Sequence, residues 1–146
     1  MLIRFVIYGL LGWCVEIVWT ALAGTLNGTQ RGWRLAGVTY LWMFPIYGLL
    51  APLYEPAHDA LRGHPWLIRG LVYATGFMAI EYVSGWLLRR LTGACPWDYT
   101  RRCRWHMRGL VRLDYAPLWA LLGLALEPVH DLLLALTPAI AAALGS

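Results

Sequence analysis

Charged residues are scarce in this sequence, and lysine is absent from it. Only 14% of the 146 residues are charged, against roughly 25% in soluble domains, while 60% are hydrophobic and the mean hydropathy is +0.54. These values exclude an ordinary soluble domain and favour one membrane-embedded bundle. All twelve basic residues are arginine. Either a GC-rich genome favours arginine codons, or guanidinium groups are used to bind carboxylate or phosphate at a membrane surface.

Motifs for the common catalytic and cofactor chemistries are also missing. Three cysteines make an odd count, so no disulfide framework follows. Cys95 and Cys103, even with Asp98 and His106, do not have a zinc-site spacing, so we expect no metal there. The sequence contains no glycine-rich phosphate loop, no G-x-S-x-G and no H-E-x-x-H. We therefore assign no catalytic residue and no cofactor, and an ATP-driven role would need a separate subunit.

Long apolar runs are what the sequence has instead. A helix needs about 20 apolar residues to cross roughly 30 Å of hydrocarbon. Four such runs predict an all-α, polytopic bundle of four transmembrane helices, at 3–23, 37–56, 66–88 and 110–128. Glu16 interrupts the first run, which therefore fits a retained helix better than a cleaved signal peptide. A last apolar stretch, 131–145, either continues the fourth helix or lies at the interface as a short helix.

The arginines are distributed unequally between the two sides of these helices. Nine lie in or beside the loops at 24–36 and 89–109, and three lie on the opposite side. Because cytoplasmic loops carry the excess of basic residues, the two loops are predicted to be cytoplasmic and the N-terminus outside. The nine are Arg31, Arg34, Arg89, Arg90, Arg101, Arg102, Arg104, Arg108 and Arg112; the three are Arg4, Arg62 and Arg69.

One heptapeptide occurs twice, 72 residues apart. Residues 55–61 read EPAHDAL and residues 127–133 read EPVHDLL, and further back Tyr8 and Glu16 align with Tyr73 and Glu81 at an offset of 65. The pattern predicts a single membrane domain, 1–146, built as a tandem repeat of a two-helix unit, about 1–62 and 66–134. An even number of spans per unit gives both copies the same orientation.

Three acidic residues are predicted to converge on the cytoplasmic half of the bilayer. Glu16 and Glu81 lie just past the middle of their helices, and Asp114 lies at the start of the fourth. Since an ionised carboxylate facing lipid is costly, these side chains should face the bundle interior or a wet cavity. They are candidate ligand-binding groups. A purely structural role remains open, with Arg112 as a partner for Asp114 or Glu81.

The repeated Glu-Pro-x-His-Asp segment lies at the opposite surface. Proline at its second position suits the start of a helix or a kink that ends one. His58 with Asp59, and His130 with Asp131, allow an acid–base pair or an external metal site. Solvated turn residues are the commoner outcome for such groups, and we predict no metal site.

The third loop combines aromatic residues with arginine. Trp97, Asp98 and Tyr99 form a compact turn, and four arginines follow within ten residues. Trp and Tyr suit the headgroup level, and each arginine near an anionic surface is worth about 1 kcal/mol. We expect membrane lipids with anionic headgroups as partners, and no nucleic acid. A simple topology signal is the alternative.

Four of these motifs together resemble a known family. They are Gly12-Trp13-x-x-Glu16, the segment from Gly37 to Gly48, Glu81-Tyr82-x-x-Gly85 and Cys95-Pro96-Trp97-Asp98-Tyr99. Over about residues 5–128 the chain is similar to the transmembrane protein 229 family, grouped with the bacterial "putative ABC-transporter type IV" (CmpB-like) membrane proteins. The resemblance implies a helical membrane fold and carries no settled activity. The positions it carries over are Glu16, Tyr47, Gly48, Glu81, Tyr82, Gly85, Trp97, Asp98, Tyr99 and Gly109, with Asp114-Tyr115 also matching.

Three functions stay open. The first is transport or binding of a proton, a cation or a cationic or lipid ligand at the buried acids. The second is an intramembrane enzyme acting on a lipid headgroup, and the third is a structural subunit of a membrane complex. Because four helices rarely enclose a pathway, we expect a homodimer or a partner membrane subunit. The candidate ligand-binding residues are Glu16, Glu81, Tyr82, Trp97, Asp98, Tyr99, Arg112 and Asp114.

Overall fold

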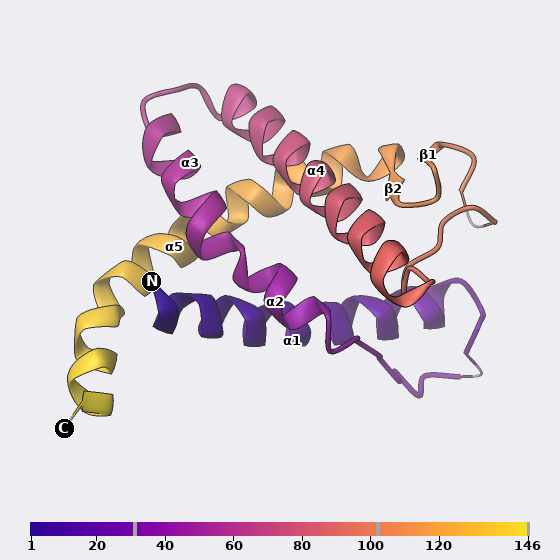
Figure 1. The fold of residues 1–146 in the computed structure, drawn as a ribbon, viewed down its shortest axis with the longest axis horizontal. Coiled ribbons are helices and arrows are strands. Elements are labelled where there is room, and N and C mark those ends of the chain that lie inside the picture. The colour runs from indigo at the N-terminus through magenta and orange to yellow at the C-terminus, as the bar shows by residue number, and fades with distance from the viewer. Residues whose placement is uncertain (31, 102, 146) are drawn as a thin grey trace. The chain divides into compact units, whose positions relative to one another are not determined.

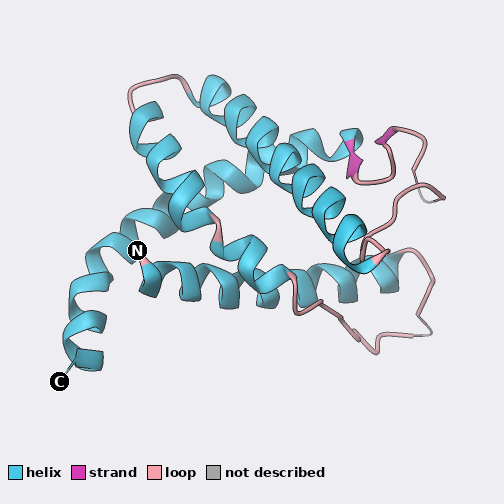
Figure 2. Cartoon of the chain, viewed as in Figure 1, coloured by secondary structure: helices cyan, strands magenta, loops and turns pink. Residues whose placement is uncertain are grey.

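The described chain is almost entirely helical, as the sequence predicts (Figures 1 and 2). The computed structural model describes residues 1–30, 32–101 and 103–145, so the predicted cytoplasmic arginines Arg31 and Arg102 lie outside the described residues. The helices are α1 (Leu2–Leu26), α2 (Met43–Gly48), α3 (Glu55–Leu61), α4 (Trp66–Thr92) and α5 (Ala116–Gly145), with a π-helical turn at Leu50–Tyr54 and a 3₁₀ turn at Leu113–Tyr115. A small hairpin pairs β1 (His106–Met107) with β2 (Val111–Arg112).

Three stretches of helix are long and apolar enough to cross a bilayer: Leu2–Leu26, Trp66–Thr92 and Leu113–Gly145. They correspond to the predicted first, third and fourth spans, and the chain is a multi-pass membrane protein. Large apolar side chains are exposed along all three, as lipid contact requires, among them Leu11, Val15, Val18, Leu71, Val72, Val83, Leu121 and Leu132. The stretch 131–145 is the continuation of α5, and Pro138 does not end the helix.

The predicted second span differs from the structure in its start and its continuity. Residues 34–40 have no regular secondary structure, and the helical segment then runs from α2 through the π-helical turn into α3, ending at Leu61. Prolines explain the break, because Pro52 and Pro56 have no N–H to donate to the preceding turn. Pro56 lies in the first turn of α3, as its motif predicts, whereas the matching Pro128 lies inside α5 and does not end it.

The chain forms two compact units, and each is described by itself. The first comprises residues 1–53 and 137–146. Within it, α2 packs on α1 where α1 carries glycine. A Cβ added at Gly12 would lie 2.1 Å from the Tyr47 ring, and one at Gly9 would lie 2.8 Å from the Phe44 ring. Small residues therefore permit this close contact, as the shared small-residue face of the first helix indicated.

The segment before α2 lies along that same face of α1. Thr20 exchanges two hydrogen bonds of 2.9 Å with the backbone of Val38, and the Trp13 indole donates to the carbonyl of Tyr40 at 3.0 Å. Irregular backbone at membrane depth is tolerated only where its polar groups are satisfied within the protein. Side chains of α1 satisfy several of these groups.

The second unit, Tyr54–Leu136, contains α3, α4, the hairpin and most of α5. Helices α4 and α5 meet along two rows of residues spaced four apart, which share a helix face. Gly123 lies against Tyr73, with only 2.4 Å between an added Cβ and the tyrosine Cβ, and Phe77 packs edge-on to Trp119 at 5.8 Å between ring centroids. Tyr54 at the start of this unit donates a 2.6 Å hydrogen bond to the Gly123 carbonyl.

The loop after α4 folds back onto that helix. Gly93, with φ +80°, ends α4 in the left-handed conformation that favours glycine. The Trp97 indole donates to the Leu110 carbonyl at 3.1 Å. Both residues lie over Gly85 of α4, where an added Cβ would come within 3.1 Å of Leu110. The Trp-Asp-Tyr turn is thereby held against the helix turn that follows Glu81.

Candidate functional site

Glu81 is the centre of the first polar cluster of the second unit. This Glu81 cluster comprises Glu81, Tyr99, Arg112, Asp114 and Tyr115. The Tyr99 hydroxyl donates to Glu81 Oε1 at 2.9 Å. Burial, and then the adjacent carboxyl group, raise the pKa of Tyr99, which therefore stays a proton donor. Glu81 Oε2 and the Trp119 indole nitrogen are both buried. The indole acts as a donor toward the Glu81 carboxyl group, but among the described residues neither atom makes a hydrogen bond of full geometry.

Arg112 pairs with Asp114, which decides between the two partners that the sequence left open. Its guanidinium donates to both carboxylate oxygens, at 3.1 and 2.6 Å, and this pairing raises the pKa of Arg112. The same group donates to the Tyr115 hydroxyl at 3.1 Å and lies 4.0 Å from the centre of that ring. Asp114 is exposed, so within the Glu81 cluster it is the surface partner of Arg112.

The remaining candidates in the loop hold its shape. Asp98 accepts hydrogen bonds from the hydroxyl and the backbone N–H of Thr100, at 2.6 and 2.9 Å. These bonds hold the pKa of Asp98 below its usual range. Gly109 has φ +72°, and a Cβ there would lie 2.3 Å from the Thr100 hydroxyl. Tyr82 is half-buried on α4, and the Glu81–Tyr99 bond does not involve it.

Glu16 lies in the first unit, where it is half-buried. Its carboxylate accepts a hydrogen bond from the Thr39 hydroxyl, in the irregular segment that lies along α1. Glu16 thus takes part in holding that segment. The proposed pairing of Glu16 with Glu81 across a repeat axis stays a prediction.

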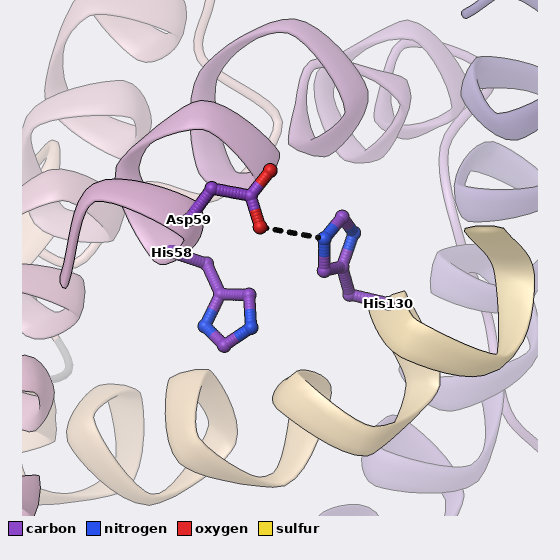
Figure 3. Close-up of side chains that lie close together, drawn as sticks. All are labelled: His58, Asp59 and His130. Atoms are coloured by element: carbon purple, nitrogen blue, oxygen red, sulfur yellow. Dashed lines mark hydrogen bonds and ion pairs between the residues drawn. The ribbon is translucent and has the colours of Figure 1, made fainter. Parts of the chain in front are cut away.

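A second polar cluster forms where α3 meets α5, from the two copies of the repeated heptapeptide. We call it the histidine cluster; its members are Glu55, His58, Asp59, Arg62, Glu127, His130 and Asp131. His58 is 3% exposed and His130 is 1% exposed. The expectation that both are solvated turn residues is wrong, because the two helices bring the imidazoles together inside the unit. Their ring centroids are 5.0 Å apart, and Figure 3 shows Asp59 facing His130.

Each histidine contacts the acids of the other copy of the motif. His58 places Nδ1 3.7 Å from Glu127 and Nε2 3.9 Å from Asp131. His130 places Nδ1 3.6 Å from Glu55 and Nε2 3.4 Å from Asp59. Two copies of the motif related by a twofold axis would form these reciprocal contacts. The tandem repeat over the whole chain remains a prediction.

Two further residues of α4 complete the cluster, and the sequence interpretation did not single them out as site residues. Arg69 Nε lies 2.9 Å from Glu127 Oε1. The Tyr73 hydroxyl donates to the same oxygen at 3.0 Å and lies 2.9 Å from His58 Nδ1. The repeat could have indicated these two residues. At the offset of 65, Arg4 aligns with Arg69 and Tyr8 aligns with Tyr73.

Comparison with known families supports the resemblance drawn from the motifs. A family model described as "putative ABC-transporter type IV" (CmpB) matches residues 3–143, nearly the whole chain. The chain belongs to this family. No solved structure matches the CmpB-family chain.

Within this CmpB-family member, the two clusters lie on one pair of facing helix rows. Along α4 the row is Arg69, Tyr73, Phe77 and Glu81, and along α5 it includes Trp119, Gly123 and Glu127. Eight residues separate Tyr73 from Glu81, or about 12 Å along the helix. The Phe77–Trp119 pair lies between the clusters. The arrangement is chemically suited to hold protons or cations at two depths, separated by an aromatic layer.

Proposed function

We propose that this protein binds or carries a proton or a cation across the membrane and that Glu81 is the group that takes it. The family name is transport-related. The observation that carries the proposal is Glu81 Oε2, a buried carboxyl oxygen that has the Trp119 indole nearby as a donor but makes no hydrogen bond of full geometry among the described residues. Such an oxygen costs about 1–3 kcal/mol if nothing satisfies it. A small cation would satisfy this oxygen, and a proton would neutralise the charge of the buried carboxylate.

The surroundings of Glu81 support this role over a purely structural one. Arg112 is committed to Asp114 and does not neutralise Glu81 by a direct ion pair. Ionisable residues within membrane-spanning helices commonly mark ion pathways or proton relays. The histidine cluster supplies a second set of titratable groups on the same helix rows. Movement of Phe77 and Trp119 would connect the two clusters.

Proton uptake into proteoliposomes tests the role of Glu81. The purified chain is reconstituted with an internal pH-sensitive dye, and acid is added outside in the presence of a potassium ionophore. Wild-type vesicles should acidify faster than empty ones. Glu81→Gln should lower the protein-dependent rate by at least about 100-fold, the lower end of what a positioned proton-transfer group contributes. Glu81→Asp should retain part of the rate.

Two results would overturn the proposal. One is a wild-type rate equal to that of empty vesicles for protons and also for sodium and potassium gradients. The other is a wild-type rate in Glu81→Gln; a wild-type rate in Glu16→Gln as well would remove both acids from the pathway. If Glu81→Gln lowers thermal stability alone, the Tyr99–Glu81 bond serves only to hold the loop, and the structural-subunit alternative is correct.

The third loop is proposed to contact anionic lipid headgroups on the cytoplasmic side of the cell membrane. Arg90, Arg101, Arg104 and Arg108 are exposed in or beside it, and none of the ion pairs found among the described residues involves them. Phosphate groups can therefore reach them. A second copy of the chain or a partner membrane subunit is proposed to complete the pathway.

Thiol labelling tests the proposed orientation. In a variant with Cys14→Ser and Cys95→Ser, Cys103 is the only cysteine left, and it lies in the third loop. Because arginine-rich loops stay in the cytoplasm, a membrane-impermeant maleimide should label it in inside-out vesicles and leave it unlabelled in intact cells. Adding His64→Cys and Cys103→Ser moves the thiol to the loop between α3 and α4. The maleimide should then label intact cells and leave inside-out vesicles unlabelled.

A further inference from the structure

The histidine cluster presents the donor atoms of a transition-metal site. Nε2 of His130 lies 3.4 Å from Asp59 Oδ1, and Nε2 of His58 lies 3.9 Å from Asp131 Oδ1. One donor atom from each of His58, Asp59 and His130 can be chosen so that all three lie within 4.8 Å of one another (Figure 3). These residues come from α3 and from α5, so the tertiary fold assembles the set.

His58 has a nitrogen that no group in the described part of the chain satisfies. Its Nε2 atom is buried and lacks a hydrogen-bond partner among the described residues. Water cannot readily replace that partner, because the side chain is only 3% exposed. An unsatisfied buried polar atom of this kind requires an explanation, and a bound ion is one of the accepted explanations. A metal ion that accepts the Nε2 lone pair would supply the missing partner.

The other nitrogen of each imidazole lies near a glutamate carboxylate, and Nδ1 of His58 also lies 2.9 Å from the Tyr73 hydroxyl. Nδ1 of His58 lies 3.7 Å from Glu127 Oε1, and Nδ1 of His130 lies 3.6 Å from Glu55 Oε1. Histidines that ligate metals almost always direct their second ring nitrogen to a carboxylate, a carbonyl or water, which fixes the tautomer. A proton on Nδ1 leaves the Nε2 lone pair of both rings free for a metal.

We infer that the cluster binds one divalent transition-metal ion, with Zn²⁺ the best match. Nε2 of His58, Nε2 of His130 and a carboxylate oxygen of Asp59 are the ligands, and Asp131 supplies the fourth. Imidazole and carboxylate donors suit zinc. Tetrahedral Zn²⁺ with bonds of about 2.0 Å needs donors roughly 3.3 Å apart. The donor atoms of His58, Asp59 and His130 lie within 4.8 Å of one another, so side-chain movement must bring them closer to complete the site.

Arg62 is the cation that a metal ion must displace. Its guanidinium pairs with Asp131 and with Asp59, the latter at 3.2 Å. The side chain is 46% exposed, and ion pairs this accessible are worth little. Asp59 and Asp131 are exposed as well, so an ion can enter from water. This site goes beyond the proposed role of Glu81.

Metal titration of the purified full chain in detergent, after removal of metals with EDTA, tests the inference. Zn²⁺ should bind at one ion per chain by calorimetry, and Co²⁺ should give the visible absorption of a four-coordinate site. His130→Ala should weaken Zn²⁺ binding by more than about 100-fold, because loss of a ligand exceeds the 10–100-fold that loss of a second-sphere partner costs. Glu127→Gln should weaken it by about 10-fold.

Arg62→Gln gives the sharpest readout, since removing a competing cation should tighten Zn²⁺ binding by roughly 10-fold. His64→Ala, which removes a nearby exposed histidine outside the cluster, should bind Zn²⁺ as tightly as wild type does.

The inference fails if the wild-type chain binds neither Zn²⁺ nor Co²⁺, or if His130→Ala and Asp59→Asn bind Zn²⁺ as tightly as wild type. Should His130→Ala not fold, Asp59→Asn and Arg62→Gln decide. Glu81→Gln should bind Zn²⁺ normally, so this inference and the Glu81 proposal fail separately.

Discussion

Replacing Glu127 with glutamine is expected to lower the free energy of unfolding by about 3–5 kcal/mol, because it leaves the guanidinium of Arg69 without its counter-charge in a largely buried place. Glu127 is 17% exposed and receives Arg69 Nε at 2.9 Å and the Tyr73 hydroxyl at 3.0 Å. The amide has nearly the same shape as the carboxyl group, so the loss comes from charge and hydrogen bonding. Reversible unfolding in mixed micelles, followed by circular dichroism, measures it.

Arg62→Gln is the matched control for this prediction. Arg62 also bridges acids of the histidine cluster, but its side chain is 46% exposed, and surface pairs contribute roughly 0–1 kcal/mol. Removing both partners, with Arg69→Met and Glu127→Leu together, should cost less than Glu127→Gln alone, because no isolated charge remains. Equal losses in Glu127→Gln and Arg62→Gln would contradict the distinction between the buried pair and the surface pair.

Gly37→Ala should be the most damaging small substitution in the first unit, with a loss of about 3 kcal/mol, the upper end for overpacking. An added Cβ would lie 1.9 Å from the backbone oxygen of Ile17. Helix backbone cannot move aside as a side chain can. The segment must therefore leave α1, which breaks the bonds from Thr20 to Val38 and from Trp13 to Tyr40.

Gly76→Ala controls for the loss of a glycine as such. Gly76 is in α4, and a Cβ there meets nothing within 4 Å. Alanine favours helix more than glycine does, by roughly 0.5–1 kcal/mol, so this variant should unfold no earlier than wild type. Thermal unfolding of both variants in the same detergent gives the comparison. A Gly37→Ala chain as stable as Gly76→Ala would mean that the segment before α2 does not lie on α1.

Helix positions were predictable because the signals for them are local. Apolar length alone locates three of the four helical segments, and Glu-Pro at 55–56 correctly indicates the start of α3. The second span was predicted with the wrong start and as one unbroken helix. The hydrophobicity of 37–56 is high enough for a span, but Pro45, Pro52 and Pro56 interrupt its helical hydrogen bonding. Hydrogen bonds with Trp13, Glu16 and Thr20 also stabilise the irregular segment that precedes α2. Hydropathy does not register either effect.

The role of each acidic residue depends more on the side chains that contact it than on its position in the sequence. Glu81 has the half-buried setting that a membrane acid requires. Asp114 has a similar place in the sequence, yet it is exposed and paired with Arg112. Arg112 is on strand β2 and Asp114 is in the turn that follows it, so the two side chains can pair although they are only two residues apart. Residues two apart on a helix do not face each other, so a helical interpretation of the sequence could not predict this contact.

The sequence by itself determined that this chain is an α-helical membrane protein of the CmpB family, with small-residue faces and a carboxyl group inside two of its helices. Composition, the length of apolar runs and motif spacing are properties of the sequence that do not depend on how the helices pack. Only the tertiary structure decided that His58 and His130, 72 residues apart, are buried against each other and share their acids. Burial of a polar side chain is decided by what packs over it, and here α5 packs over α3.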